Sequence, residues 1–286
     1  MTTSSINHVG ICLNYVSLSA IPICILMHKT KSLLCTLLIG FILTMSSHFN
    51  GVSAQQNVKD STISMHLITA HFAYQFPSGD MASRFGHSAM VGPAYFYKSS
   101  ENWLLGAEVG FFFGDKVKDK NNILSNIETE DGNIVDVDGI YATYHFYERG
   151  YSFLAKAGKI FPFRKPNPNS GIMLGAGAGL IQHKIFIDHR DRTAPQITGD
   201  YLKGYDELKR GPALNVFAGY LYTGNSKVVN FYANIDLTVG FTKDVRPYSF
   251  AKRQYNDGKY TDYIVSLKLG WLIPVYKRAP KDFYYY

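Results

Sequence analysis

The sequence predicts an all-β fold, an eight-stranded antiparallel up-and-down transmembrane β-barrel with long extracellular loops and short periplasmic turns. Three observations predict it. Apolar and polar residues alternate with period two over segments longer than most soluble strands. Aromatic residues gather near the ends of these segments. The connections between the segments are alternately long and short, as in barrels of this kind.

The alternation is clearest in residues 227–241. From Val229 to Phe241 every second residue is apolar, and the residues between them are almost all polar or small. The pattern is weakest in 87–97, where Pro93 cannot donate a hydrogen bond to a neighbouring strand. Ten residues at a rise of ~3.3 Å, tilted about 45°, span roughly the 25 Å apolar band of a membrane barrel. The other predicted strands are 64–76, 103–114, 150–161, 171–188, 212–222 and 262–273.

Aromatic residues on the apolar face separate a membrane barrel from a soluble β-sandwich, which also alternates. Rings near strand ends match the two interfacial girdles of a lipid-facing barrel. The opposite face carries glycine, asparagine and charges, which suit a polar barrel interior better than a sandwich core. The predicted interfacial aromatics are Tyr74, Phe76, Tyr95, Tyr97, Trp103, Phe111, Phe113, Tyr220, Tyr222 and Trp271.

The lengths of the connections predict the topology. Counting residues 141–148 as a ninth strand would break the alternation of long and short connections, so we assign them to the second outer loop or to a rim extension. Long loops then lie outside, and both ends of the barrel lie on the periplasmic side. The long connections are 77–86, 115–149, 189–211 and 242–261, and the short ones are 98–102, 162–170 and 223–226.

Residues 1–54 are predicted to be a signal-peptide region. Lys29 and Lys31 form a basic n-region, and residues 32–45 form an apolar h-region. Small residues at the end of the region predict cleavage after Ala54. The stretch before Met27 is long for an n-region, which makes Met27 the expected start.

Two alternatives remain for this region. A lipoprotein signal at Cys35 fits less well because Leu34 precedes it where a small residue is expected, and the other alternative is an N-terminal membrane anchor. Beyond the region no run of 18 apolar residues predicts a transmembrane helix. Residues 55–286 are therefore predicted to form the barrel domain, with a periplasmic tail at 276–286.

Composition excludes some classes of protein. The 286 residues include 29 Lys+Arg and 22 Asp+Glu, and this excess of positive charge is too small and too scattered to indicate nucleic-acid binding. An aromatic content of 15% argues against a disordered chain. All the cysteines, Cys12, Cys24 and Cys35, precede the predicted cleavage site, so we expect no disulfide in the mature protein.

The polar face places four charges inside the predicted barrel. Eight-stranded barrels are filled by side chains, and an unpaired buried charge costs several kcal/mol, so these charges should pair. Glu108 and Lys156 lie on neighbouring strands, and so do Asp236 and Lys268, which makes these the expected pairs. A gated ion or proton path is the functional alternative.

We find no motif for catalysis, for a cofactor or for a metal. The row Gly175, Gly177 and Gly179 lacks the Lys-Ser/Thr pair of a phosphate-binding loop and predicts a structural role on a strand. Asp136 and Asp138 do not match a twelve-residue calcium loop, and neither does the group Asp188, His189 and Asp191. The candidate catalytic groups, which show no triad spacing, are His71, His87, His145, His183, His189, Ser83, Ser88, Asp188 and Asp191.

The organisation of residues 55–286 resembles the eight-stranded outer-membrane barrels of the OmpA/OmpX type. The stretches LIQHKIFI (180–187), TGDYLKGYDELKRG (198–211) and GWLIPVYKRAPKDFYYY (270–286) resemble poorly characterised outer-membrane barrels of Bacteroidota. The resemblance implies a bacterial outer-membrane location and contact with outer-membrane lipid and lipopolysaccharide. The chain departs from it in its basic-aromatic tail and in having no peptidoglycan-binding domain of the OmpA type.

From these observations we expect a non-enzymatic barrel with a filled lumen, no cofactor and poor conductance. Its expected role is that of a structural or accessory subunit of an envelope protein complex, by analogy in barrel assembly or type IX secretion. The alternatives are an outer-membrane lipid-modifying enzyme and a surface adhesin. The tail either contacts a protein partner or serves as a recognition signal during barrel insertion. Its candidate contact residues are Lys277, Arg278, Lys281, Phe283, Tyr284, Tyr285 and Tyr286.

Overall fold

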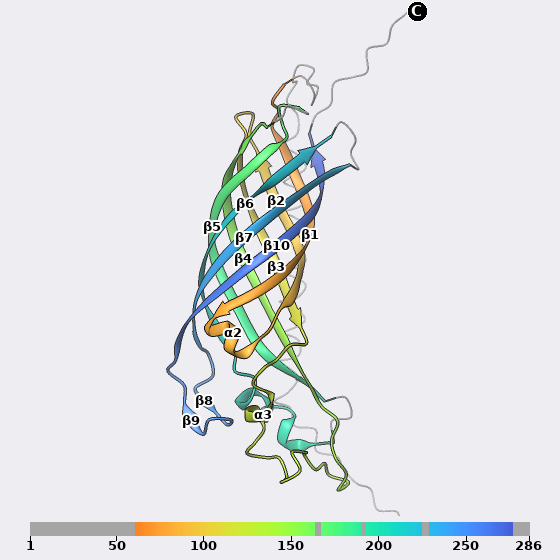
Figure 1. Cartoon of the computed structure of the whole chain (residues 1–286), viewed down its shortest axis with the longest axis vertical. Helices are drawn as coiled ribbons and strands as arrows, with labels where there is room; N and C mark the ends of the chain where they lie inside the picture. Colours follow the sequence, from red (N-terminus) through yellow and green to blue (C-terminus); the bar gives the residue numbers. More distant parts are fainter. Residues whose placement is uncertain (1–60, 164–166, 190–192, 225–228, 277–286) are drawn as a thin grey trace, which may run out of the picture. The chain divides into compact units, whose positions relative to one another are not determined.

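Eight long strands form a closed antiparallel ring in the computed structural model, which describes residues 61–163, 167–189, 193–224 and 229–276 (Figure 1). Each strand of the ring pairs with its neighbour in the chain, and the last pairs with the first. The predicted fold class, an eight-stranded up-and-down barrel, is therefore confirmed. The strands are β1 (Met65–Gly79), β2 (Ser88–Lys98), β3 (Trp103–Gly114), β4 (His145–Phe161), β5 (Gly171–Asp188), β6 (Lys209–Thr223), β7 (Asn230–Asp244) and β10 (Lys259–Val275).

The alternation of the sequence becomes an inside and an outside. On β7 the side chains of Ile235 and Phe241 are 56% and 49% exposed, whereas Asn234 and Asp236, on either side of Ile235, are buried. Successive residues of a strand point to opposite faces, so one face lines the lumen and the other surrounds the barrel. On β7 the apolar residues therefore lie mostly on the outer face, the reverse of a soluble core.

Several strands extend further toward the long loops than the hydrophobic pattern predicts. β4 begins at His145, so residues 145–148 of the segment assigned to the second outer loop continue this strand. They pair with the end of β5, where His145 faces Asp188. The outward residues of this extension include Tyr147 and Arg149, which carry polar groups. Apolar alternation therefore does not predict this part of the strand.

Pro93 does not prevent β2 from forming. Its side chain faces outward, and the β2–β3 pairing is interrupted there, between the pairs Val91–Phe111 and Ala94–Glu108. A Cβ on the neighbouring Gly92 would lie only 1.8 Å from the carbonyl oxygen of Val109. A glycine at this position therefore lets the two backbones approach beside the proline.

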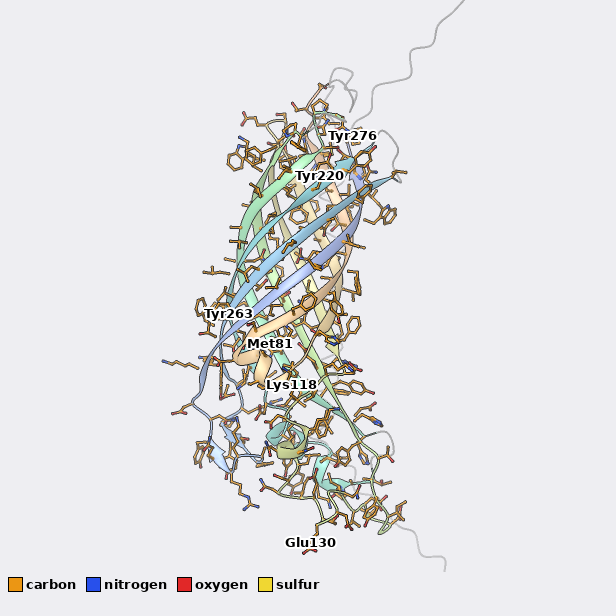
Figure 2. The ribbon with its side chains drawn as sticks, viewed as in Figure 1. Met81, Lys118, Glu130, Tyr220, Tyr263 and Tyr276 are labelled. Atoms are coloured by element: carbon orange, nitrogen blue, oxygen red, sulfur yellow. The ribbon has the colours of Figure 1, made fainter. Side chains whose placement is uncertain are left out.

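The two ends of the barrel differ. At one end, the loop end, the connections carry α2 (Asp80–Arg84), α3 (Lys120–Ile123) and the strand pair β8 (Tyr248–Ser249) and β9 (Gln254–Tyr255) (Figure 1). At the other, the turn end, the connections are shorter, and Figure 2 labels Tyr220 and Tyr276 there. Among the described residues no helix is long and apolar enough to cross a membrane. The predicted signal region and cleavage site lie outside the described residues.

Candidate functional site

The four predicted lumen charges form one ring of alternating sign. Lys156 Nζ donates to Glu108 Oε2 at 3.0 Å and to Asp236 Oδ2 at 2.7 Å. Lys268 Nζ donates to Glu108 Oε1 at 2.5 Å and to Asp236 Oδ2 at 2.8 Å. Each acid therefore contacts both bases. The structure brings together the expected pairs and adds two contacts across the lumen, from β4 to β7 and from β10 to β3.

Neighbouring side chains make further contacts with the residues of this charge ring. Asn234 donates its side-chain NH₂ to the second oxygen of Asp236 at 2.7 Å. Lys156 Nζ lies 5.0 Å from the centre of the Phe217 ring, a cation–π distance. Its stem passes over Gly177, where an added Cβ would lie 2.9 Å from Lys156 Cγ. The glycine row of β5 therefore has the structural role predicted for it, making room for the side chains that fill the lumen.

Little free space remains on either side of the charge ring. A cavity of about 10 Å³ lies toward the turn end, and another of about 10 Å³ lies toward the loop end. Each is about the size that holds a single water molecule. Apolar clusters close the lumen beyond both cavities, around Leu67 and Phe96 at the turn end and around Phe112 and Ile181 at the loop end. The described lumen is thus a packed core with a charged middle layer.

A second polar cluster lies in the lumen at the loop end. His183 Nε2 is 2.9 Å from Asp262 Oδ2, and Thr242 donates its hydroxyl to the same oxygen at 2.6 Å. Arg84 of α2 enters the barrel mouth, with Nη1 3.4 Å from His183 Nδ1 and Nε 3.1 Å from Glu207 Oε2. Burial lowers the pKa of Arg84, and the adjacent Glu207 opposes this shift. These contacts of Arg84 hold the short helix α2 at the mouth of the barrel.

Sequence reasoning did not place Arg84 and Glu207 in the lumen, because both belong to loops that have no periodic pattern. His183 and Asp262 could have been found, since both occupy inward positions in the alternation of their strands. Lys209 is a further missed residue: it is buried, pairs with Asp244 at 2.8 Å, and lies over the ring of Tyr260.

The other candidate catalytic residues are dispersed. His87 bonds the hydroxyl of Tyr74 and Ser88 donates to Gln75, so these sequence neighbours diverge as expected for a strand. Ser83 donates to the backbone oxygen of Asp80, and His145 stacks on Tyr147.

His71 lies in the lumen within electrostatic range of the charge ring, and its ring nitrogens have no hydrogen-bond partner among the described residues. His189 is buried, whereas Asp188 is half-buried on the outward face of β5. Asp191 lies outside the described residues.

The acidic loop residues considered as metal ligands form a turn. Asp136 Oδ1 accepts hydrogen bonds from the backbone N–H groups of Asp138 and Ile140, at 2.9 and 3.1 Å. A hydrogen bond from the Thr193 side chain, together with these backbone bonds, holds the pKa of Asp136 below its usual range. Among the described residues no group of three or more His, Cys, Asp or Glu side chains is placed to hold a metal ion.

The long loops fold together into a layer that we call the outer cap, comprising residues 80–87, 115–144, 193–208 and 245–258. Backbone hydrogen bonds join the first two loops, from Lys118 N to Arg84 O at 2.8 Å, and the second and third, from Val137 N to Thr193 O at 3.1 Å. The third and fourth loops are joined by Phe250 N to Gly204 O at 2.9 Å. Each loop is therefore tied to another.

The outer cap has an apolar core of its own, continuous with the core at the barrel mouth. Burial, together with a hydrogen bond to Glu128, raises the pKa of Tyr144 to about 12, so this phenol is a neutral donor at physiological pH. Arg246 forms two bonds to the carboxylate of Asp206, which raise the pKa of the guanidinium. The buried residues of this apolar core that belong to the cap are Met81, Phe85, Val117, Ile123, Leu124, Ile134, Ala194, Ile197 and Tyr205.

The ten predicted interfacial aromatics all lie on the outward face of the barrel. Trp103 and Trp271 are 53% and 48% exposed and lie near the turn end, and Tyr74 and Phe76 lie near the loop end. Phe113, Tyr220 and Tyr222 are half-buried, and the other seven are exposed. The tail residues 277–286 lie outside the described residues.

A closed ring of eight strands with an apolar outside, a filled lumen with a charged middle layer, and long loops at one end is the architecture of the transmembrane β-barrels of the bacterial outer membrane. No protein-family model matches the sequence, and no curated protein matches it.

Solved structures similar to this chain include three barrels. Neisserial surface protein A is 14% identical with a TM-score of 0.41, and the match covers 73% of this chain and 96% of that protein. Ail, the attachment invasion locus protein of Yersinia pestis, is 10% identical with a TM-score of 0.38, over 74% and 99%. The outer membrane protein OprG from Pseudomonas aeruginosa is 11% identical with a TM-score of 0.34, over 76% and 99%.

Proposed function

We propose that the protein is a non-enzymatic, non-conducting outer-membrane barrel that acts as a structural or accessory subunit of an envelope protein complex. The observation that carries this proposal is the outer cap, because four loops packed around a common core form a fixed surface that a partner can recognise. The packed lumen supports the non-conducting part. Barrel assembly and type IX secretion are the complexes that we propose by analogy.

The partner surface that we propose is the cap tip, formed by Val137, Ile140 and Tyr141 of the second loop. These side chains are 68%, 63% and 56% exposed. Contact of large apolar side chains with water is unfavourable, and a cluster of them at the surface is typical of a protein-binding site. Asp138 follows Val137 in the chain, and Asp131 accepts a hydrogen bond from the Tyr141 hydroxyl at 3.2 Å. A partner with an apolar pocket and a basic rim would match this surface.

The test compares complexes purified from native outer membranes after mild cross-linking. We expect Val137→Ser, Ile140→Ser and Tyr141→Ser together to remove a defined complex that the unchanged protein forms with another envelope protein. Tyr255→Ser is the matched control, because Tyr255 is 80% exposed in the fourth loop and lies outside the cap tip. An unchanged complex in the triple variant would exclude the cap tip as the partner surface.

A surface adhesin is the second candidate, favoured by the same tip because it lies at the end of the barrel that faces outward in this class. Adhesion of intact cells that depends on the cap tip, with no change in envelope complexes, would support the adhesin and exclude the accessory role.

A further inference from the structure

Five cations stand on the outside of the barrel at the loop end, one on each of five neighbouring strands. We call them the cation belt: Arg149 on β4, Lys184 on β5, Arg210 on β6, Lys243 on β7 and Lys259 on β10. Arg149 is paired directly with Lys184 across the ladder, and Lys243 is paired with both Arg210 and Lys259. The register thus places them in a nearly continuous row.

The belt faces away from the lumen. Glu148, His183, Lys209 and Thr242, each next to a belt residue in the chain, are buried inside the barrel, and alternation turns the belt residues outward. The belt borders the apolar band, since Tyr263, labelled in Figure 2, is the second outward residue after Lys259 on β10. Other exposed band residues next to the belt are Tyr151, Leu180, Leu214 and Phe241.

No described carboxylate forms an ion pair with any residue of the belt. Like charges directly opposite each other on neighbouring strands repel and destabilise the pairing. Arg210, Lys243 and Lys259 form a row of three such cations, and bound anions would offset this repulsion.

Part of the belt is held in place by neutral groups. The Arg149 guanidinium lies 5.0 Å from the ring centre of Tyr147 and 5.7 Å from that of Phe186. Arg210 donates from Nε to Gln182 at 2.6 Å, which leaves its other nitrogens available. Such contacts orient a guanidinium without neutralising it, which favours binding of phosphate oxygens.

The belt has no counterpart at the turn end. Among the described strand residues, the outward Lys or Arg there is Lys159, which lies over the ring of Trp103. Long loops face outward in this class of barrel, so the belt lies at the surface of the outer leaflet. The ligand that fits the belt is accordingly a polyanion that belongs to the outer leaflet and is absent from the inner leaflet.

We propose that the cation belt binds the phosphate groups of the phosphorylated glycolipid of the outer leaflet, lipid A. The apolar band beside the belt contacts the acyl chains, and the belt contacts the phosphates at the level of the headgroup. Several strands contribute one cation each, so the lipid phosphates are bound around half of the barrel rather than in a pocket.

The experiment measures retention of lipid by the full-length barrel in nanodiscs of zwitterionic phosphatidylcholine that contain bisphosphorylated lipid A. Native mass spectrometry counts the lipid A molecules that remain bound. We expect Arg210→Gln, Lys243→Gln and Lys259→Gln together to weaken retention about tenfold, which corresponds to about 1.4 kcal/mol. The control is Lys120→Gln, Lys203→Gln and Arg253→Gln, which removes the same charge from exposed cap positions and should retain lipid A like the unchanged protein.

Two further arms identify the ligand chemistry. Lipid A stripped of its phosphates should bind the unchanged barrel as weakly as the belt variant binds the phosphorylated lipid. Inorganic phosphate should displace lipid A no better than sodium chloride of equal ionic strength. Equal retention by the belt variant and the control would overturn the proposal, as would retention independent of the lipid phosphates or specific displacement by inorganic phosphate.

Discussion

A buried charge in this lumen depends on its neighbours for its stability. Each carboxylate of the charge ring accepts from two lysines, and no member of the ring is more than 3% exposed. The sequence predicts the inward position of all four residues because alternation fixes the face of each one. The contacts across the lumen could not be predicted, since they depend on how the closed barrel staggers its strands, which a single sequence does not reveal.

Removing one acid of the charge ring should therefore lower the stability of the barrel more than removing an acid together with a base. We expect Glu108→Gln to lower the free energy of unfolding by about 3–5 kcal/mol, because two lysines then share one carboxylate in a dry core. Urea unfolding in lipid vesicles, followed by tryptophan fluorescence, measures the change.

The matched control is the double variant Glu108→Met with Lys268→Met, which leaves the pair Lys156–Asp236 balanced. It should lose much less stability than Glu108→Gln, since apolar replacement of a buried pair is often nearly neutral. A double variant that is less stable than the single one would contradict this account of the charge ring.

The strands and the outer cap differ in how far the sequence predicts them. All eight strands follow from period-two alternation, and β3 and β5 even have the predicted bounds. The cap could not be predicted, because its apolar residues have no period and meet only through contacts between different loops. The structure has four long loops at one end, as predicted, although strands such as β4 extend into the predicted loop ranges. The shared core of these loops depends on tertiary contacts, which the sequence pattern does not show.

The cap should unfold separately from the strands when its core is damaged. Ile134 is fully buried in the second loop, and Ile134→Ala should cost about 2–5 kcal/mol of local stability. Limited trypsin digestion should then cut the loops much faster while the strands remain folded, as judged by circular dichroism.

Val137→Ala is the matched control for this prediction, since Val137 is exposed in the same loop. It should leave the rate of cleavage unchanged. Equal acceleration in both variants, or none in Ile134→Ala, would show that the loops do not share a stabilising core.

At the scale of the whole molecule, the outside of the barrel is apolar in the middle and has aromatic residues toward its ends, with a row of cations at the loop end. The described lumen is filled, so the barrel exposes its chemistry at its surfaces: the cap tip, the cation belt and the lipid-facing band. The sequence predicts the membrane location from this outer face. The cap tip could not be predicted from the sequence, because a binding surface on a loop leaves no periodic pattern in the chain.

The central claim, that this outer face lies in lipid, is tested most directly by quenching of tryptophan fluorescence with brominated lipids. The chain has 2 tryptophans, Trp103 and Trp271, both exposed on the outside near the turn end. In vesicles, lipids brominated close to the headgroup should quench both strongly, and lipids brominated at the chain ends should quench them less. The variants Trp103→Phe and Trp271→Phe separate the two signals. Quenching by aqueous iodide, with none by either lipid, would contradict a membrane-embedded barrel.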